Sequence, residues 1–181
     1  MEIVTERLRL REFTGGDLPV LVGYHADSRY GEFAGPDDPQ ADARELFRMF
    51  IRWADERPRR NYQLAVAERG QSGELLGCCG VRTGGFDAGR AEFGIELAPD
   101  WWRHGYATEA ARAILEFGFH ELGLQAIGAV SVTENAPVTR LAQRLGFRVV
   151  GRRPGPAWME ARGWSHTEWA LTRELWEAHE A

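Results

Sequence analysis

The chain has 181 residues, of which 44% are hydrophobic and 27% are charged. This is the composition of a soluble folded domain rather than of a disordered chain. All 22 basic residues are arginine and the formal net charge is −5, which argues against a non-specific nucleic-acid binder or a protein held on an anionic membrane. With no lysine in the chain, none is available to form a Schiff base or to serve as a phosphate-loop lysine. We expect one domain over residues 1–181.

The two cysteines, Cys78 and Cys79, are adjacent. Neighbouring cysteines cannot form an undistorted disulfide, and two of them are too few for a metal site. Unbridged thiols suit a reducing compartment. No apolar run reaches the roughly 20 residues of a membrane span, and residues 1–7 lack the apolar stretch of a signal peptide. We therefore expect a cytoplasmic protein with no metal and no membrane partner.

The first half of the chain predicts a strand, two helices and three further strands. Polar and apolar residues alternate over 7–13, and Asp17 is placed to cap a helix over 18–26. Glycine, proline and aspartate predict a loop over 30–39, and helical spacing of apolar residues predicts a helix over 42–56. The strands are expected at 62–67, 75–81 and 91–97, with a turn over 69–73.

The second half predicts a helix over 104–121, a strand over 125–132, a helix over 136–145 and strands over 147–158 and 164–171. A strand–helix–strand unit of this length forms a right-handed parallel crossover. The strands at 91–97 and 125–132 should therefore be parallel, and the remaining pairs antiparallel. The fold class expected is a three-layered mixed α/β (α+β) domain with a largely antiparallel sheet of about seven strands and helices on both faces.

The segment that follows the strand at 91–97 could bind an anion. A short loop leads through Arg103 and Gly105 into a helix, and a helix N-terminus presents free N–H groups and the positive end of its dipole. Gly105 and Ala107 would let a ligand approach the backbone, and Arg103 adds a positive charge. Taken alone, the same residues fit an ordinary strand-to-helix turn.

A second informative segment follows the strand at 125–132. Asn135 ends the strand, Pro137 lies in the first turn of the next helix, and Gly146 with Phe147 ends that helix. Asn135 could cap the helix or hydrogen-bond an amide-containing ligand. The residues alone leave both roles open.

Four segments, taken in order, resemble the GNAT superfamily of acyl-CoA-dependent N-acetyltransferases, and more closely its ribosomal-protein N-terminal (RimJ/RimL-type) branch. They are TERLRLR at 5–11, LGCCGV at 76–81, GYATEA at 105–110, and the segment from Asn135 to Phe147. The resemblance spans nearly the whole chain and implies a GNAT-like fold around the parallel unit.

The resemblance implies acetyl-CoA as co-substrate. Family members hold the CoA pyrophosphate on backbone amides of one loop, which here comprises Trp102, Arg103, His104, Gly105, Tyr106, Ala107 and Thr108. Trp102 replaces the usual Gln or Arg, and because amides hold the phosphates this loss should be modest. The pantetheine arm would pair with the edge at Glu96, Leu97 and Ala98, where the Leu97 N–H would polarise the thioester carbonyl. Asn135 and Arg140 would complete the cofactor site.

An amine nucleophile must be neutral, so a base or a water relay has to accept its proton. Glu92, Gly94 and Glu96 share one face of their strand because alternate residues point the same way. Two carboxylates that face one cleft could raise each other's pKa and supply the base. Glu92 could equally be a solvated or salt-bridged residue, and the choice between Glu92 and Glu96 stays open.

The residues expected to protonate the leaving thiolate are missing. The RimJ/RimL-type branch often has Ser three residues after the Asn, and other members have Tyr seven residues after it; here these positions are Val138 and Ala142. Thr139 is rotated away by about 100°. Either the thiolate leaves unassisted, because a thiol is already fairly acidic, or the protein is not a competent catalyst.

By the same resemblance, the first two helices and residues 158–169 should wall the acceptor cleft. Tyr30 and Phe33 lie in this part of the chain, and most of its aromatic residues should be core. Some of Trp53, Trp158 and Trp164 could line a pocket, and His166 could touch substrate, although a surface or strand-paired His fits equally.

The sequence thus predicts direct transfer of acetyl from acetyl-CoA to a primary amine in a ternary complex. The acceptor would be a protein N-terminal α-amine, an amino acid or another small amine, or an antibiotic. The alternative is a non-catalytic acyl-CoA-binding or sensing domain. Edge strands near the C-terminus are compatible with a homodimer, and no nucleic-acid partner is expected.

Overall fold

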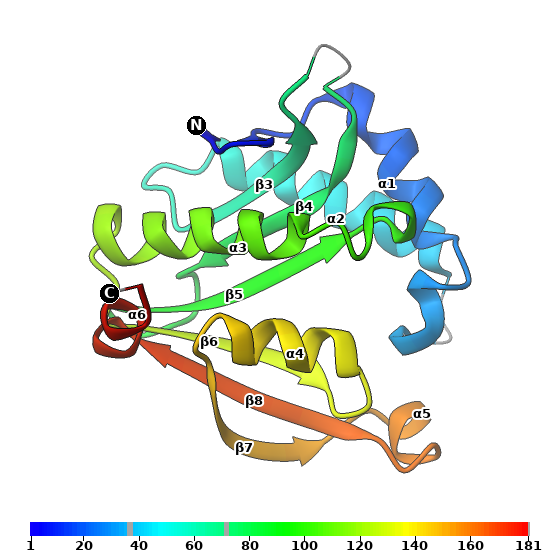
Figure 1. Ribbon diagram of the computed structural model, residues 1–181. Helices are drawn as coiled ribbons and strands as arrows, with labels where there is room; N and C mark the ends of the chain where they lie inside the picture. The colour runs from blue at the N-terminus through cyan, green and yellow to red at the C-terminus, as the bar shows by residue number, and fades with distance from the viewer. Residues whose placement is uncertain (36–37, 71–72, 181) are drawn as a thin grey trace.

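The computed structural model describes residues 1–35, 38–70 and 73–180 (Figure 1). Its described residues form an eight-stranded sheet in the order β1-β2-β3-β4-β5-β6-β8-β7. β5 and β6 are parallel, and every other neighbouring pair is antiparallel. The predicted mixed α/β class and its parallel unit are confirmed.

The strands are β1 (Glu2–Val4), β2 (Leu8–Arg11), β3 (Asn61–Glu68), β4 (Leu75–Arg82), β5 (Arg90–Leu97), β6 (Ala126–Val132), β7 (Arg148–Pro154) and β8 (Ser165–Thr172). The α-helices are α1 (Leu18–His25), α2 (Pro39–Ala54), α3 (Tyr106–Glu116), α4 (Ala136–Arg144), α5 (Ala157–Glu160) and α6 (Arg173–Glu180). A 3₁₀ turn covers Tyr30–Phe33, and a π-helical turn, Phe117–Glu121, continues α3.

The sheet separates two apolar layers. Buried residues of α3 and α4 pack with Val81, Phe93 and Ile127 on one face, where both helices lie in front of the sheet in Figure 1. Buried residues of α1 and α2 pack on the opposite face. Cys79 belongs to the first layer and Cys78 to the second, because successive strand residues point to opposite faces. Both thiols are free and buried.

Local capping explains where the first elements differ from prediction. α2 begins at Pro39, inside the predicted loop, because the Asp38 carboxylate accepts hydrogen bonds from the Gln40 and Ala41 amides at 2.9 and 3.2 Å. The Asp17 carboxylate does not cap α1. It accepts instead from the backbone N–H of Thr14 and from Arg11, each at 2.7 Å.

Two predicted connections extend beyond the described residues: the loop over 30–39 includes Pro36 and Asp37, and the turn over 69–73 includes Gln71 and Ser72. The predicted strand over 147–158 is wrong at its end, because β7 stops at Pro154 and α5 follows. β1 and α6 were not predicted. α3 starts two residues later than expected because Gly105 adopts a left-handed conformation.

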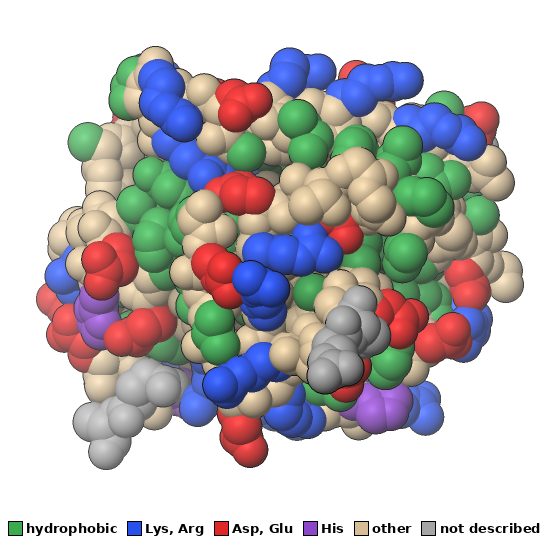
Figure 2. All heavy atoms as spheres, turned by 90° about the horizontal axis from the view of Figure 1, so that it is seen from above, with side chains coloured by type: hydrophobic (Ala, Val, Ile, Leu, Met, Phe, Trp, Pro, Cys, Tyr) green, Lys and Arg blue, Asp and Glu red, His purple; other side chains and the backbone are tan. Residues whose placement is uncertain are grey.

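The sheet has two edge strands, β1 and β7. Val149 and Val150 are exposed on β7, and a homodimer through this end stays a prediction. Figure 2 shows acidic and basic side chains interspersed on one face of the molecule. In the described part of the chain, no helix combines the length and the hydropathy needed to cross a membrane.

Candidate active site

The parallel strands β5 and β6 pair only over their first residues. The register joins Arg90, Ala91 and Glu92 to Ala126, Ile127 and Gly128, and beyond this point the strands diverge (Figure 1). The remaining half of β5 therefore has β4 on one side and no strand partner on the side of β6. The divergence leaves unpaired the edge at Glu96, Leu97 and Ala98, which the resemblance assigns to the pantetheine arm.

A hollow of about 160 Å³ lies at the start of the divergence. It is lined by Arg82, Glu92, Phe93, Gly94, Ile95, Ala129, Val130, Ser131, Val138, Leu141, Ala142, Leu145, Phe147 and Trp169. Phe93 belongs to the apolar layer under α3 and α4, whereas Glu92 and Gly94 alternate with it and point to the opposite face. The hollow therefore joins the two faces of the sheet between the splayed strands.

The Leu97 peptide faces the divergence. Ala98 N–H donates to the Leu76 carbonyl of β4 at 2.8 Å, and in an antiparallel pair successive residues alternate between bonding the neighbour and pointing away. The Leu97 N–H and C=O thus point away from β4. Consistent with this, the Leu97 carbonyl accepts a hydrogen bond from the Trp102 indole at 2.8 Å. Among the described residues no strand pairs with this N–H, which leaves it for the role of oxyanion donor that the resemblance implies.

The predicted pyrophosphate loop ends at the N-terminus of α3. Gly105 is the N-cap, with φ of 82°, and the amides of Tyr106, Ala107 and Thr108 are the first of the helix, which have no carbonyl partner within it. Arg103 also has positive φ, 66°, a conformation that costs a non-glycine residue about 1–2 kcal/mol. The loop thus brings the unpaired amides of the first turn of α3 to the end of β5, where an anion site would need them.

Arg7 braces this loop, a role that the sequence analysis missed. Its guanidinium donates to the His104 carbonyl at 2.9 Å and to the Glu109 carboxylate at 2.7 Å, and it lies 4.7 Å from the centre of the Tyr106 ring. Burial opposes ionisation of Glu109, but hydrogen bonds from Thr5 and Arg7 lower its pKa overall. The signal was the segment 5–11, which contributed to the family resemblance without an assigned role.

Asn135 caps α4. Its Oδ1 accepts from the Val138 N–H at 3.2 Å, which realises one of its two predicted roles and leaves the side-chain NH₂ for a ligand. The side chains of Val138 and Ala142 both line the hollow, so the two positions that lack a proton donor do face the candidate site. Thr139 is not among the lining residues, as predicted. Arg140 is exposed on α4.

Glu92 forms a salt bridge. Its carboxylate lies 3.1 Å from the Arg82 guanidinium, which also donates to Gln63 Oε1 at 2.9 Å. The guanidinium lies directly over Gly94, where a Cβ would be only 2.7 Å from it. Glu92 is therefore committed to Arg82, in line with the salt-bridged alternative.

Glu96 is the centre of a cluster that the sequence did not reveal. Its carboxylate accepts hydrogen bonds from the hydroxyls of Tyr24 and Tyr30 at 2.7 and 2.5 Å, and His25 Nε2 lies 3.1 Å away. The Cys78 thiol donates to it at 3.4 Å. These partners come from α1, the 3₁₀ turn and β4, so no sequence spacing could have linked them.

The cluster keeps Glu96 ionised. Burial disfavours the charge, but the hydrogen bond and charge of His25, followed by the hydrogen bonds of Tyr30 and Tyr24, lower its pKa below 4.5. Burial and the nearby Glu96 raise the pKa of both tyrosines and of Cys78. The expected mutual raising of the two glutamate pKa values is wrong for Glu96, whose pKa moves down.

The expected aromatic wall is present in part. Phe33 packs on Trp164 with ring centres 5.5 Å apart, and the Arg162 guanidinium contacts both the Trp158 and the Trp164 rings, 5.4 and 5.0 Å from their centres. These contacts bring the 3₁₀ turn and the 158–164 segment together. Trp53 packs instead on Phe50 in the layer of α1 and α2.

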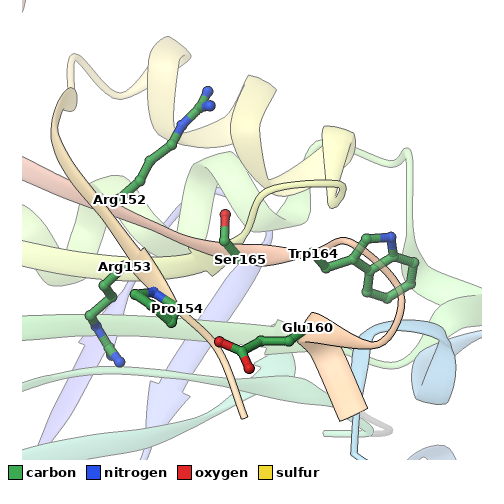
Figure 3. Close-up of a pocket in the computed structure, with 6 residues that line it drawn as sticks. All are labelled: Arg152, Arg153, Pro154, Glu160, Trp164 and Ser165. Atoms are coloured by element: carbon green, nitrogen blue, oxygen red, sulfur yellow. The ribbon is translucent and has the colours of Figure 1, made fainter. Parts of the chain in front are cut away.

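A second, more open hollow of about 450 Å³ lies next to this wall (Figure 3). It is lined by Arg152, Arg153, Pro154, Glu160, Trp164 and Ser165. In the close-up, Glu160 extends from α5 toward Pro154, while Arg152 and Arg153 project to opposite sides of β7. It shares no lining residue with the hollow at the strand divergence.

His166 stands near this hollow on β8, opposite Arg153. Within the described chain its Nδ1 is buried without a hydrogen-bond partner. Burial and the charge of Arg153 lower the pKa of the imidazole. Contact between His166 and substrate stays a prediction.

The opened parallel pair, the hollow beside it and the N-terminus of α3 form one candidate site, at the place where the family resemblance expects the acyl donor. The model of the acetyltransferase (GNAT) domain family matches residues 7–148. The chain therefore belongs to the GNAT acetyltransferase family and is an acyltransferase. This family uses acetyl-CoA as acyl donor.

Similar proteins agree with this assignment. The chain is 29% identical to the uncharacterized N-acetyltransferase YoaA of Bacillus subtilis over 147 residues, 81% of this chain and 82% of YoaA. A 62-residue segment, 34% of this chain, is 36% identical to the spermidine N(1)-acetyltransferase of Escherichia coli and covers 33% of it. The crystal structure of a GNAT-family acetyltransferase from Bacillus anthracis superposes with a TM-score of 0.76 at 26% identity, covering 96% of this chain and 99% of that one.

Proposed function

We propose that this protein transfers an acetyl group from acetyl-CoA directly to a primary amine within a ternary complex. The observation that carries the proposal is the hollow that joins both faces of the sheet at the β5–β6 divergence. A donor that enters from the side of α3 and α4 can meet an acceptor that enters from the side of α1 and α2. Direct transfer needs no covalent enzyme intermediate.

The residues present fit acetyl-CoA. The α3 amides and the left-handed Gly105 offer a site for the pyrophosphate, and the free side of β5 offers the Leu97 N–H to an extended pantetheine arm. The Asn135 side-chain NH₂ lies across the divergence, at the start of α4. A thioester carbonyl placed at Leu97 would receive the N–H bond as its oxygen gains charge.

For the acceptor side we propose Glu96 rather than Glu92. Glu92 is held in a salt bridge by Arg82, whereas Glu96 is 22% exposed, stays ionised and accepts hydrogen bonds from the Tyr24 and Tyr30 hydroxyls, with His25 3.1 Å away. An ionised carboxylate beside aromatic rings suits an ammonium group. The segment similarity to the spermidine acetyltransferase favours a small amine, while the RimJ/RimL-type motifs favour a protein α-amine.

Groups of this chain can support each step of the transfer. The neutral amine attacks the thioester carbonyl, the C–N bond forms, and the Leu97 N–H supports the oxyanion. The C–S bond then breaks with its electron pair left on sulfur, and the amine proton passes to Glu96, directly or through water. Because the pKa of Glu96 is low, this carboxylate is a weak base that passes the proton on to solvent.

A non-catalytic acyl-CoA-binding domain is the second candidate. Val138 and Ala142 both face the hollow without a proton to donate, and this observation favours it. Thiol release from acetyl-CoA, measured with spermidine, free amino acids and peptides with a free N-terminus, separates the two. We expect one of these three classes of amine to give both release of the CoA thiol and an acetylated product. Saturable binding of acetyl-CoA without release in any class would establish the sensor instead.

A further inference from the structure

Ser131 is the hydroxyl-bearing residue of the hollow. The other residues that line the hollow are the Arg82–Glu92 pair, Gly94, Trp169 and a set of apolar or aromatic side chains. Ser131 lies on β6 with 8% of its surface exposed. A thiolate that forms in such a hollow would lack the water that stabilises it in solution, so a hydrogen-bond donor in the wall gains importance.

The hydroxyl of Ser131 is oriented by Trp169. The indole N–H donates to Ser131 Oγ at 2.9 Å, so one lone pair is occupied and the Ser131 proton must point elsewhere. Within the described residues, the Ser131 hydroxyl makes no hydrogen bond besides this one, so its own proton has no acceptor there. Accepting a bond also polarises a hydroxyl and strengthens it as a donor.

The position of Ser131 matches the end of a ligand arm. Strand pairing stops at Glu92 and Gly128, three residues before Ser131 on β6. An arm that starts at the α3 N-terminus and follows the free side of β5 runs toward this point and brings its reactive end into the hollow. Ser131 lies on the side of α4 there, because it is two residues from Ala129 and four from Ile127 and therefore points to the same face of the sheet as these two residues of the apolar layer.

We propose that the Ser131 hydroxyl donates a hydrogen bond to the sulfur of CoA as the C–S bond breaks, with Trp169 as its positioning residue. The inference rests on the proposed function. The electron pair of the C–S bond stays on sulfur, and no proton leaves Ser131, because an alcohol is a far weaker acid than a thiol. A donor on β6 thus replaces the missing donors at Val138 and Ala142 on α4.

Ionisation of bound CoA tests this without knowledge of the acceptor. The ultraviolet absorbance of the thiolate is followed against pH in the protein saturated with CoA, with the protein saturated with desulfo-CoA as blank. We expect Ser131→Ala to raise the pKa of the bound thiol by about one to two, with CoA affinity at neutral pH nearly unchanged. Thr139→Ala, which removes a neighbouring hydroxyl outside the hollow, should leave this pKa as in the wild type.

Two further variants make the test independent of packing. Ser131→Cys nearly preserves the shape but is a weak donor, and should behave as Ser131→Ala does. Adding Val138→Ser to Ser131→Ala should restore a donor from the opposite wall and lower the pKa again. Bound CoA with the same thiol pKa in the wild type and in both Ser131 variants would overturn the role of Ser131. Failure of the folded wild type to bind CoA would instead overturn the proposed function.

Discussion

Replacing Gly105 tests whether the α3 amides hold a phosphate group. Gly105→Val puts a β-branched residue at φ of 82°, with its Cβ 3.3 Å from the Arg7 guanidinium. The left-handed conformation costs about 1–3 kcal/mol of folding free energy, which a domain with roughly 5–15 kcal/mol of stability survives. The side chain would also lie between the amides and a bound pyrophosphate.

The magnitude follows from the bonds that would be lost. One charge-assisted hydrogen bond is worth about 1.5–3 kcal/mol, so we expect acetyl-CoA to bind about 10- to 150-fold more weakly. Isothermal titration measures the affinity, and thermal unfolding confirms that the variant is folded.

Gly123→Val is the matched control. Gly123 has φ of 68° with open space around it and follows the π-helical turn, so the substitution brings similar backbone strain away from the loop. It should lose comparable stability and keep its acetyl-CoA affinity. Equal affinities of Gly105→Val and Gly123→Val would refute the assignment of the phosphate site.

Three further predictions concern the base, the loop and the leaving group. Glu96→Gln should slow transfer and change the pH–rate profile, whereas Glu92→Gln should change neither. Since the pKa of Glu96 is lowered from 4.5, its ionised form stabilises the fold above that pH, and this contribution disappears as the pH falls through the lowered pKa. Glu96→Gln should therefore flatten the acid side of the plot of unfolding free energy against pH, and an unchanged plot would contradict the cluster. Arg7→Ala should weaken acetyl-CoA binding several-fold by titration while costing about 1 kcal/mol or less in chemical denaturation, because Arg7 is 44% exposed. Val138→Ser should leave turnover in a thiol-release assay unchanged, because Ser131 already supplies a donor to the leaving sulfur, and a gain would show that a donor still limits the reaction.

The elements around the cofactor loop could be predicted because local patterns fix them. Strict alternation defined β5, and the Gly105 and Pro137 positions defined the starts of α3 and α4. The crossover rule gave the parallel pairing. Elements set by tertiary contact were missed: β1 has only three residues and needs β2 as its partner, and α6 is held by Trp176, which packs in the core.

The candidate site divides in the same way. Leu97, Gly105 and Asn135 lie within continuous motifs and could be named from the sequence. Glu96 was named, but its partners Tyr24 and Tyr30 stand 72 and 66 residues away and carry no shared spacing. Only the packing of α1 and the 3₁₀ turn over β5 brings these side chains together.

The central claim is that acetyl-CoA binds along the free side of β5 with its phosphates at the start of α3. Backbone amide NMR during an acetyl-CoA titration tests it most directly. We predict saturating shifts concentrated at Leu97 and at Gly105 through Thr108, with a smaller set at the Asn135 side chain. Saturable binding whose shifts fall instead around the hollow of Arg152 and Trp164, or a folded protein with no shifts, would contradict it.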